Sequence, residues 1–191
     1  MQSYLTHLEC TACKREYAYE QPIRTCNTCD KVLYPRYDLQ RLRKDMDREQ
    51  LLDRSPNLWR FFELLPLQDS INMVTLGEGG TPLLKATDLS SKLGIDNLFI
   101  KEEGGNPTGS FKARGMAVAV SRAKELGLKR LCVPSAGNAA GALAAYAARA
   151  GLEAHVFMPE DAPAANREEC VVLGANLTLV QGHIGDAGKL S

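Results

Sequence analysis

The stretch at residues 114–159, RGMAVAVSRAKELGLKRLCVPSAGNAAGALAAYAARAGLEAHVFMP, decides the fold. It predicts a helix over 114–127, a strand from 130 that runs into a glycine turn, an alanine-rich helix over 138–151 and a strand from 153. Each of the two helices ends at a glycine, the usual residue for a left-handed C-terminal cap. Strands that alternate with helices of this length are typical of an α/β fold with a doubly wound, mostly parallel sheet.

The same alternation continues on both sides of this stretch. Upstream, NLFIKEE (97–103) reads as a short apolar strand. Downstream, a helix over 166–174 and a strand over 176–182 follow, and the last residues resemble the start of another helix. Because no closing strand comes after that helix, we expect the chain to be a truncated part of a longer protein.

Three regions differ in composition. Residues 1–36 are polar and carry two cysteine pairs, residues 37–65 are highly charged, and residues 66–191 form the α/β region. In the middle region Leu39, Leu42, Met46 and Leu51 recur at roughly helical spacing. We therefore predict a helical linker, broken before Pro56 because the residue that precedes a proline disfavours helical backbone.

The overall composition is that of a soluble globular protein, with 45% hydrophobic residues, 24% charged residues and a formal net charge of zero. That charge balance gives no indication of a nucleic-acid or membrane-surface partner. No apolar run approaches the roughly 18 residues that a membrane span needs, and the first residues lack the features of a secretory signal. The expected location is the cytoplasm, a reducing compartment.

Cys10, Cys13, Cys26 and Cys29 form two C-x2-C pairs. In a reducing compartment this spacing favours a structural Zn²⁺ site, because two tight turns bring four thiolates into a tetrahedron and leave no open position for catalysis. The alternatives are two disulfides or four reduced cysteines. Cys132 and Cys170 lie in apolar segments, so we expect both to be reduced, buried and without a catalytic role.

The segment NPTGSFK (106–112) places a lysine at the start of a predicted helix, directly after a turn. The positive end of the helix dipole disfavours the charged form of Lys112, which suits an amine that attacks an aldehyde. A solvated surface lysine is the alternative, and spacing alone does not decide between them.

The segment SAGN (135–138) is a glycine turn that follows a strand and opens a helix. Such a turn presents free N–H groups and the positive end of the helix dipole to an anion. Read alone, the segment is equally consistent with an ordinary strand-to-helix turn.

Three ordered motifs and the N-terminal cysteines resemble the threonine synthases and their relatives among the fold-type-II pyridoxal-phosphate (PLP) enzymes, whose fold is similar to the tryptophan synthase β chain. The motifs are GEGGTPLL (77–84), NPTGSFKARG (106–115) and PSAGNAAGALAAYAARAG (134–151). The resemblance implies that Lys112 binds PLP covalently and moves protons, that Phe111 packs by the cofactor and that Asn138 donates to the pyridoxal 3′-oxygen. It implies that the substrate α-carboxylate binds to Ser135, Gly137, Asn138 and Ala139.

The resemblance implies a homo-oligomer, a dimer, that acts on a small amino-acid substrate, with conversion of O-phospho-L-homoserine and water to L-threonine and phosphate. Ala113 departs from the pattern, since many threonine synthases have Asp after the lysine and dehydratases of this fold often have an apolar residue. A threonine or serine dehydratase is therefore the alternative. A zinc-ribbon binding module with an inactive PLP-like part is an alternative of another class. The phosphate-binding loop and the partner of the pyridine nitrogen are expected after residue 191.

Overall fold

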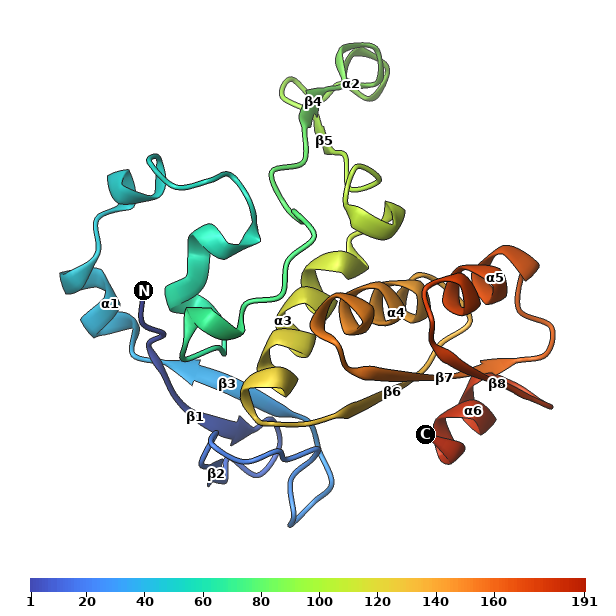
Figure 1. The fold of residues 1–191 in the computed structure, drawn as a ribbon. Helices are drawn as coiled ribbons and strands as arrows, with labels where there is room; N and C mark the ends of the chain where they lie inside the picture. Colours follow the sequence, from blue (N-terminus) through green and yellow to red (C-terminus); the bar gives the residue numbers. More distant parts are fainter.

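The computed structural model describes residues 1–191 and contains a parallel three-stranded sheet and an N-terminal antiparallel sheet. Figure 1 shows both sheets and an arm that projects from them. The N-terminal sheet has the order β2-β1-β3 and consists of β1 (Leu5–Cys10), β2 (Glu16–Tyr17) and β3 (Leu33–Tyr37). The linker contains α1 (Leu39–Asp45), η1 (Arg48–Leu51), η2 (Leu58–Leu64) and η3 (Ser70–Asn72). The arm contains β4 (Leu83–Lys85), α2 (Thr87–Leu93) and β5 (Phe99–Lys101).

The C-terminal part has the predicted alternation of helices and strands. Its elements are η4 (Pro107–Gly109), α3 (Lys112–Glu125), β6 (Arg130–Pro134), α4 (Asn138–Ala150), β7 (Glu153–Pro159), α5 (Ala164–Val172), β8 (Asn176–Val180) and α6 (Ile184–Leu190). Strands β6, β7 and β8 pair in parallel, with α4 and α5 on one face and α6 on the other (Figure 1). Helices on both faces of a parallel sheet confirm the predicted fold class.

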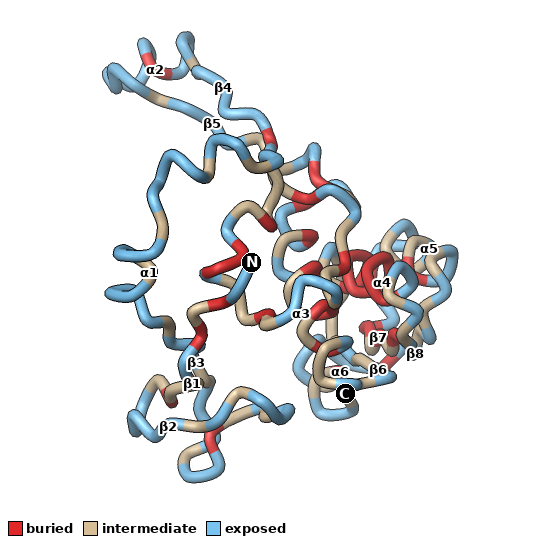
Figure 2. The backbone as a smooth tube through the Cα atoms, turned by 60° about the vertical axis from the view of Figure 1, so that its left-hand side comes forward, coloured by how far each residue is buried: buried red, intermediate tan, exposed pale blue.

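The strand expected over 97–103 forms, but it does not join the parallel sheet. As β5 it pairs antiparallel with β4, and the register joins Leu83 to Lys101. Both strands are exposed along their length (Figure 2), whereas α2 between them has one buried residue, Ser90. A short apolar run predicts a strand but does not identify the strand that pairs with it, which explains the difference.

The linker helix is also less continuous than its spacing suggests. Met46 has an extended backbone that ends α1, and the carboxylate of Asp47 then accepts from N–H of Glu49 to begin η1. No residue of α1 is buried. A short helix without a packed face has little to sustain it, so the local caps determine where it ends.

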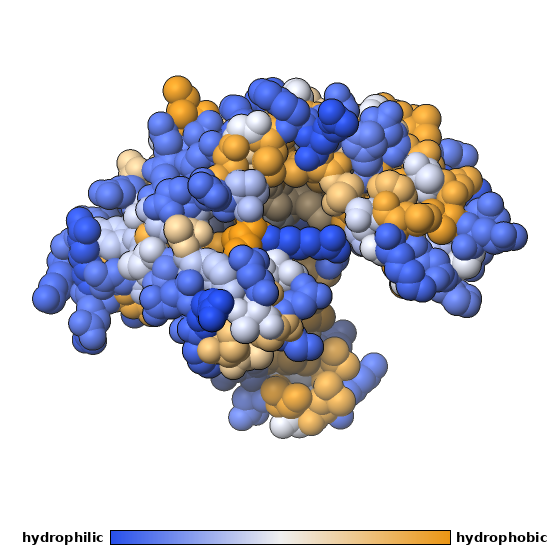
Figure 3. Space-filling view, turned by 90° about the horizontal axis from the view of Figure 1, so that it is seen from below, coloured by the Kyte–Doolittle hydropathy of each residue, from blue (hydrophilic) through white to orange (hydrophobic).

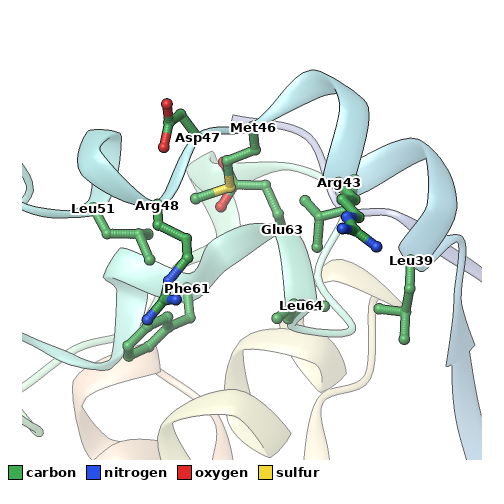
Figure 4. A pocket seen from close by; sticks show the side chains of 10 residues that line it. Leu39, Arg43, Met46, Asp47, Arg48, Leu51, Phe61, Glu63 and Leu64 are labelled. Carbon is green, nitrogen blue, oxygen red and sulfur yellow. The ribbon is translucent and has the colours of Figure 1, made fainter.

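The linker segments enclose an apolar pocket of about 260 Å³ (Figure 4). Apolar side chains from α1, η1 and η2 provide most of the lining, among them Leu39, Met46, Leu51, Phe61 and Leu64. None of the residues proposed for the cofactor or the substrate lines it. This pocket therefore plays no part in the candidate active site.

The core is built around α4, whose residues Ala140–Ala147 are all buried (Figure 2). The small alanine side chains allow α3, α5 and the sheet to approach the helix closely. Cys170 is buried and reduced, as predicted. The prediction that Cys132 is buried is wrong, because this residue is exposed. Its neighbours Leu131 and Val133 pack against the core. Side chains alternate along a strand, so Cys132 points to the opposite face of the sheet.

The loop that follows β2 contacts the C-terminal half of α3. Arg122 donates a hydrogen bond to the carbonyl of Tyr19 and lies over the Tyr19 ring, 5.6 Å from its centroid. Residues of the N-terminal region and of α3 also line a mostly apolar pocket of about 470 Å³. Seen from below in Figure 3, the molecule is largely hydrophilic, with apolar residues in patches around a central hollow. None of the helices is long and apolar enough to cross a membrane.

Candidate active site and metal centre

The lysine turn has the backbone that its sequence predicts. Pro107 begins η4, and Thr108 and Gly109 both have positive φ, at 59° and 64°. The N–H of Gly109 donates to the carbonyl of Asn106 at 3.0 Å. Lys112 is the first residue of α3, and its N–H donates to the hydroxyl of Ser110 at 3.3 Å. The turn therefore delivers the lysine at a helix N-terminus.

The side chain of Lys112 is exposed and no hydrogen bond or ion pair engages its amine. Nζ lies 4.9 Å from the ring centroid of Phe111, which is itself 57% exposed. The next residue, Ala113, is fully buried in the main core. A small apolar residue fits this position because a carboxylate there would be desolvated.

The loop before α4 has the features of an anion site. Gly137 is the N-cap residue of α4 and, as a glycine, has no side chain that could accept from the first N–H groups of the helix. The N–H groups of Asn138 and Ala139 donate to no carbonyl. The hydroxyl of Ser135 accepts from N–H of Gly137 at 3.3 Å. Asn166 of α5 donates to the carbonyl of Ala136 at 2.8 Å and so holds the loop.

The structure brings the elements of these two motifs together. Both η4 and α3 pack against α4, so the lysine turn lies beside the helix that SAGN opens (Figure 1). No hydrogen bond joins Lys112 to residues 135–139. An unpaired amine, an exposed aromatic ring and free N–H groups suit a cofactor that carries an aldehyde and a substrate that carries a carboxylate.

A buried carboxylate beside this site was missed from the sequence. Glu78 is fully buried, and it accepts from Nε1 of Trp59 at 2.6 Å, from the Tyr146 hydroxyl at 2.5 Å and from N–H of Leu76 at 3.0 Å. Burial, together with the hydrogen bond to Glu78, raises the pKa of Tyr146. Glu78 therefore connects the linker, through Trp59, to α4, through Tyr146. The one indication in the sequence was that this glutamate lies among the glycines of GEGG (77–80).

We expect Tyr146→Phe to lower the free energy of unfolding by about 1–3 kcal/mol, because it removes one donor from a buried carboxylate. Urea unfolding of the full-length protein measures the change. Tyr34→Phe is the matched control, since Tyr34 is 54% exposed and its hydroxyl makes no hydrogen bond. Equal stability of the two variants would show that Glu78 does not depend on this donor.

The four N-terminal cysteines form one cluster, with their Sγ atoms all within 4.8 Å of one another. The Sγ–Sγ distance is 3.4 Å for Cys10 and Cys29 and 3.5 Å for Cys13 and Cys26. These are far beyond a disulfide bond of about 2.05 Å and close to the roughly 3.8 Å between thiolates around a tetrahedral zinc. All four are free cysteines.

The two cysteine turns share one backbone pattern. In the first, N–H of Lys14 donates to the carbonyl of Cys10 at 3.2 Å, and in the second, N–H of Asp30 donates to Cys26 at 2.8 Å. Lys14 and Asp30 both have positive φ. Tyr17, which sequence reasoning did not single out, lies with its hydroxyl 3.1 Å from Sγ of Cys26. This hydrogen bond, together with backbone N–H groups of Thr28 and Cys29, lowers the pKa of that thiol to about 5. Repeated turns and a stabilised thiolate fit a bound Zn²⁺.

Comparison with known proteins agrees with this arrangement. The family model described as "Pyridoxal-phosphate dependent enzyme" matches residues 74–191. The chain is 41% identical to the threonine synthase of Methanosarcina acetivorans over 95% of its own length and 44% of that protein. It is 40% identical to the threonine synthase of Methanocaldococcus jannaschii over 93% of its length and 44% of that protein. The chain thus spans less than half of these relatives.

A solved structure gives the same result for the fold. The processed form of threonine deaminase isoform 2 from Solanum lycopersicum aligns with a TM-score of 0.51 and 31% identity, over 56% of this chain and 30% of that one. The family model covers more than half of the residues and includes both the lysine turn and the loop before α4. The chain therefore belongs to the family of pyridoxal-phosphate dependent enzymes.

Proposed function

We propose that the full-length protein is a threonine synthase, which converts O-phospho-L-homoserine and water to L-threonine and phosphate. The observation that carries the proposal is the unpaired Lys112 amine at the start of α3, in a turn that packs against α4. The similarity to two threonine synthases along almost the whole chain supports the same activity. The aligned region covers 95% and 93% of the chain, so it is longer than the 118 residues (74–191) that the family model matches.

Lys112 would hold the cofactor covalently and would accept the proton from Cα of the substrate as a general base. PLP, when bound, would supply the electron sink that makes this proton transfer possible. Later in the reaction the same amine would move protons at the neighbouring carbons. An exposed amine without a competing partner suits these repeated transfers.

The start of α4 would bind the substrate carboxylate. The N–H groups of Asn138 and Ala139 lack acceptors, and the Ser135 hydroxyl and Gly137 lie in the same loop. Free N–H groups at a helix N-terminus bind anions without a charged side chain. We assign the side chain of Asn138, which is exposed, to the pyridoxal 3′-oxygen. Phe111 would pack beside the ring.

The cysteine cluster would hold one structural Zn²⁺ through Cys10, Cys13, Cys26 and Cys29. Four thiolates complete a tetrahedron, so the ion would stabilise the N-terminal sheet and take no part in the reaction. The contact between Arg122 and Tyr19 would transmit this stability to α3.

An assay of the full-length protein with two substrates tests the proposed reaction. We expect threonine and phosphate in equal amounts from O-phospho-L-homoserine, and no appreciable ketoacid from threonine or serine. The rival dehydratase activity is favoured by Ala113 and by the likeness to threonine deaminase. If the protein forms ketoacid from threonine and releases no phosphate from O-phospho-L-homoserine, it is a dehydratase and the proposed synthase activity is wrong.

A further inference from the structure

The carboxylate of Glu103 is the centre of a hydrogen-bond cluster that surrounds the lysine turn. It accepts from Nε and Nη2 of Arg114, each at 2.7 Å, in a bidentate ion pair. It also accepts from the hydroxyl of Thr81 at 2.6 Å and from Nδ2 of Asn106 at 3.0 Å. Nη2 of Arg114 donates to the Thr81 hydroxyl as well, at 3.1 Å. We call the pair of Glu103 and Arg114 the clamp.

The clamp holds the lysine turn at both ends. Asn106 is the residue before η4, and Arg114 lies in the first turn of α3, so Lys112 lies between two side chains that donate to the same carboxylate. Asn106 is buried, and its Oδ1 also accepts from N–H of Gly79 at 3.0 Å. The turn is thereby fixed to the GEGGTP segment as well as to itself.

The physical character of the clamp suits a positioning role. A bidentate pair between a guanidinium and a carboxylate fixes an orientation as well as a distance. Both side chains are less than one-third exposed, which reduces screening by solvent. The hydrogen bonds from Arg114 and then Thr81 lower the pKa of Glu103 to about 2, so the carboxylate is charged at any pH at which the enzyme works. A rotation of the first turn of α3 would break both bonds of the pair.

We propose that the clamp of Glu103 and Arg114 positions the Lys112 amine for its attack on the cofactor aldehyde and for its proton transfers. The inference rests on the proposed function, because it requires Lys112 to be the lysine that binds PLP. Neither Glu103 nor Arg114 would touch the reacting atoms. Both act through the backbone of residues 106–114, and small errors in such placement can slow a reaction by about 10²-fold.

The test uses the full-length holoenzyme and three variants: Arg114→Ala, Arg114→Lys and Glu103→Gln. Arg130→Ala is the matched control, since the pair between Arg130 and Glu153 is exposed and 3.8 Å long. The measurements are the rate of covalent PLP incorporation, the pH midpoint of the absorbance band of lysine-bound cofactor, and kcat and KM separately. Each variant is first checked for folding by circular dichroism.

We expect Arg114→Ala to slow incorporation and to lower kcat by up to about 10²-fold with little change in KM, because orientation rather than binding is lost. The pH midpoint should shift in all three variants. Arg114→Lys should restore the charge but not the bidentate geometry, and so should recover only part of kcat. Arg130→Ala should match the wild type. If Arg114→Ala does not fold, Arg114→Lys and Glu103→Gln decide the question.

Folded variants with wild-type incorporation, pH midpoint and kcat would overturn the inference, even if they unfold more easily than the wild type. Such a result would leave the clamp as a structural ion pair. A failure of the proposed function looks different: the wild-type protein itself would then show no cofactor on Lys112.

Discussion

Lys112→Ala is expected to abolish covalent attachment of PLP to the full-length protein and to reduce turnover by at least about 10²–10⁴-fold. This range is the usual contribution of a single positioned acid–base group, and the variant also loses the nucleophile. Non-covalent affinity for PLP should fall less, because the cofactor phosphate is expected to bind elsewhere in the protein. Absorbance spectra, equilibrium dialysis with PLP and the phosphate-release assay measure the three effects.

Lys124→Ala is the control for this prediction. Lys124 lies in the last turn of the same helix, far along α3 from Lys112. Its replacement should leave the spectrum and the turnover unchanged. A Lys112→Ala enzyme that retains the lysine-bound absorbance band would refute the assignment.

Loss of the zinc ligands is expected to have the largest effect on stability. Protein purified without added zinc should contain one equivalent, and Cys26→Ser should lose it, since the serine hydroxyl is a poor replacement for a thiolate. Zinc contributes about 10–16 kcal/mol to the folding of small zinc-finger peptides. We therefore expect the N-terminal sheet to unfold in this variant, with rapid proteolysis within residues 1–36.

Cys132→Ser provides the control, because Cys132 is an exposed thiol outside the cluster. Its zinc content and its proteolysis pattern should equal those of the wild type. Metal analysis and limited proteolysis together make the measurement. Less than half an equivalent of zinc in folded wild-type protein, with four titratable thiols in the cluster, would contradict the zinc site.

The sequence predicted the features that depend on local interactions. Helices α3 and α4 each end before a glycine with positive φ, Gly127 and Gly151, and both glycines were visible in the sequence. The lysine turn was predicted for the same reason, because Pro107 and Gly109 specify its backbone. The close approach of the four cysteines followed from the spacing within each pair and the expectation of a common ion.

Features that depend on non-local pairing were not predicted. The partner of β5 is β4, and nothing in an apolar run of three residues selects this pairing over the parallel sheet. Cys132 and Cys170 lie in similarly apolar segments, yet only Cys170 faces the core. Strand alternation determines such a difference only once the covered face is known.

The clamp and the buried Glu78 were missed because their partners lie far apart in the sequence. Glu103 and Arg114 are separated by the whole lysine turn, and Glu78 and Tyr146 by most of the α/β region. Glutamates usually lie on the surface, so a sequence gives no reason to expect Glu78 or Glu103 to be held by these partners. The chemistry of the site could be inferred from its motifs, whereas the contacts that hold it required the fold.

Borohydride reduction of the holoenzyme tests most directly whether Lys112 is the residue that binds the cofactor. Reduction makes the lysine–cofactor bond permanent, and peptide mapping by mass spectrometry then identifies the modified residue. We predict one pyridoxyl group per chain, on the peptide that contains Lys112. A pyridoxyl group on Lys85, Lys101, Lys124 or any other lysine would contradict the assignment and the proposed function that rests on it.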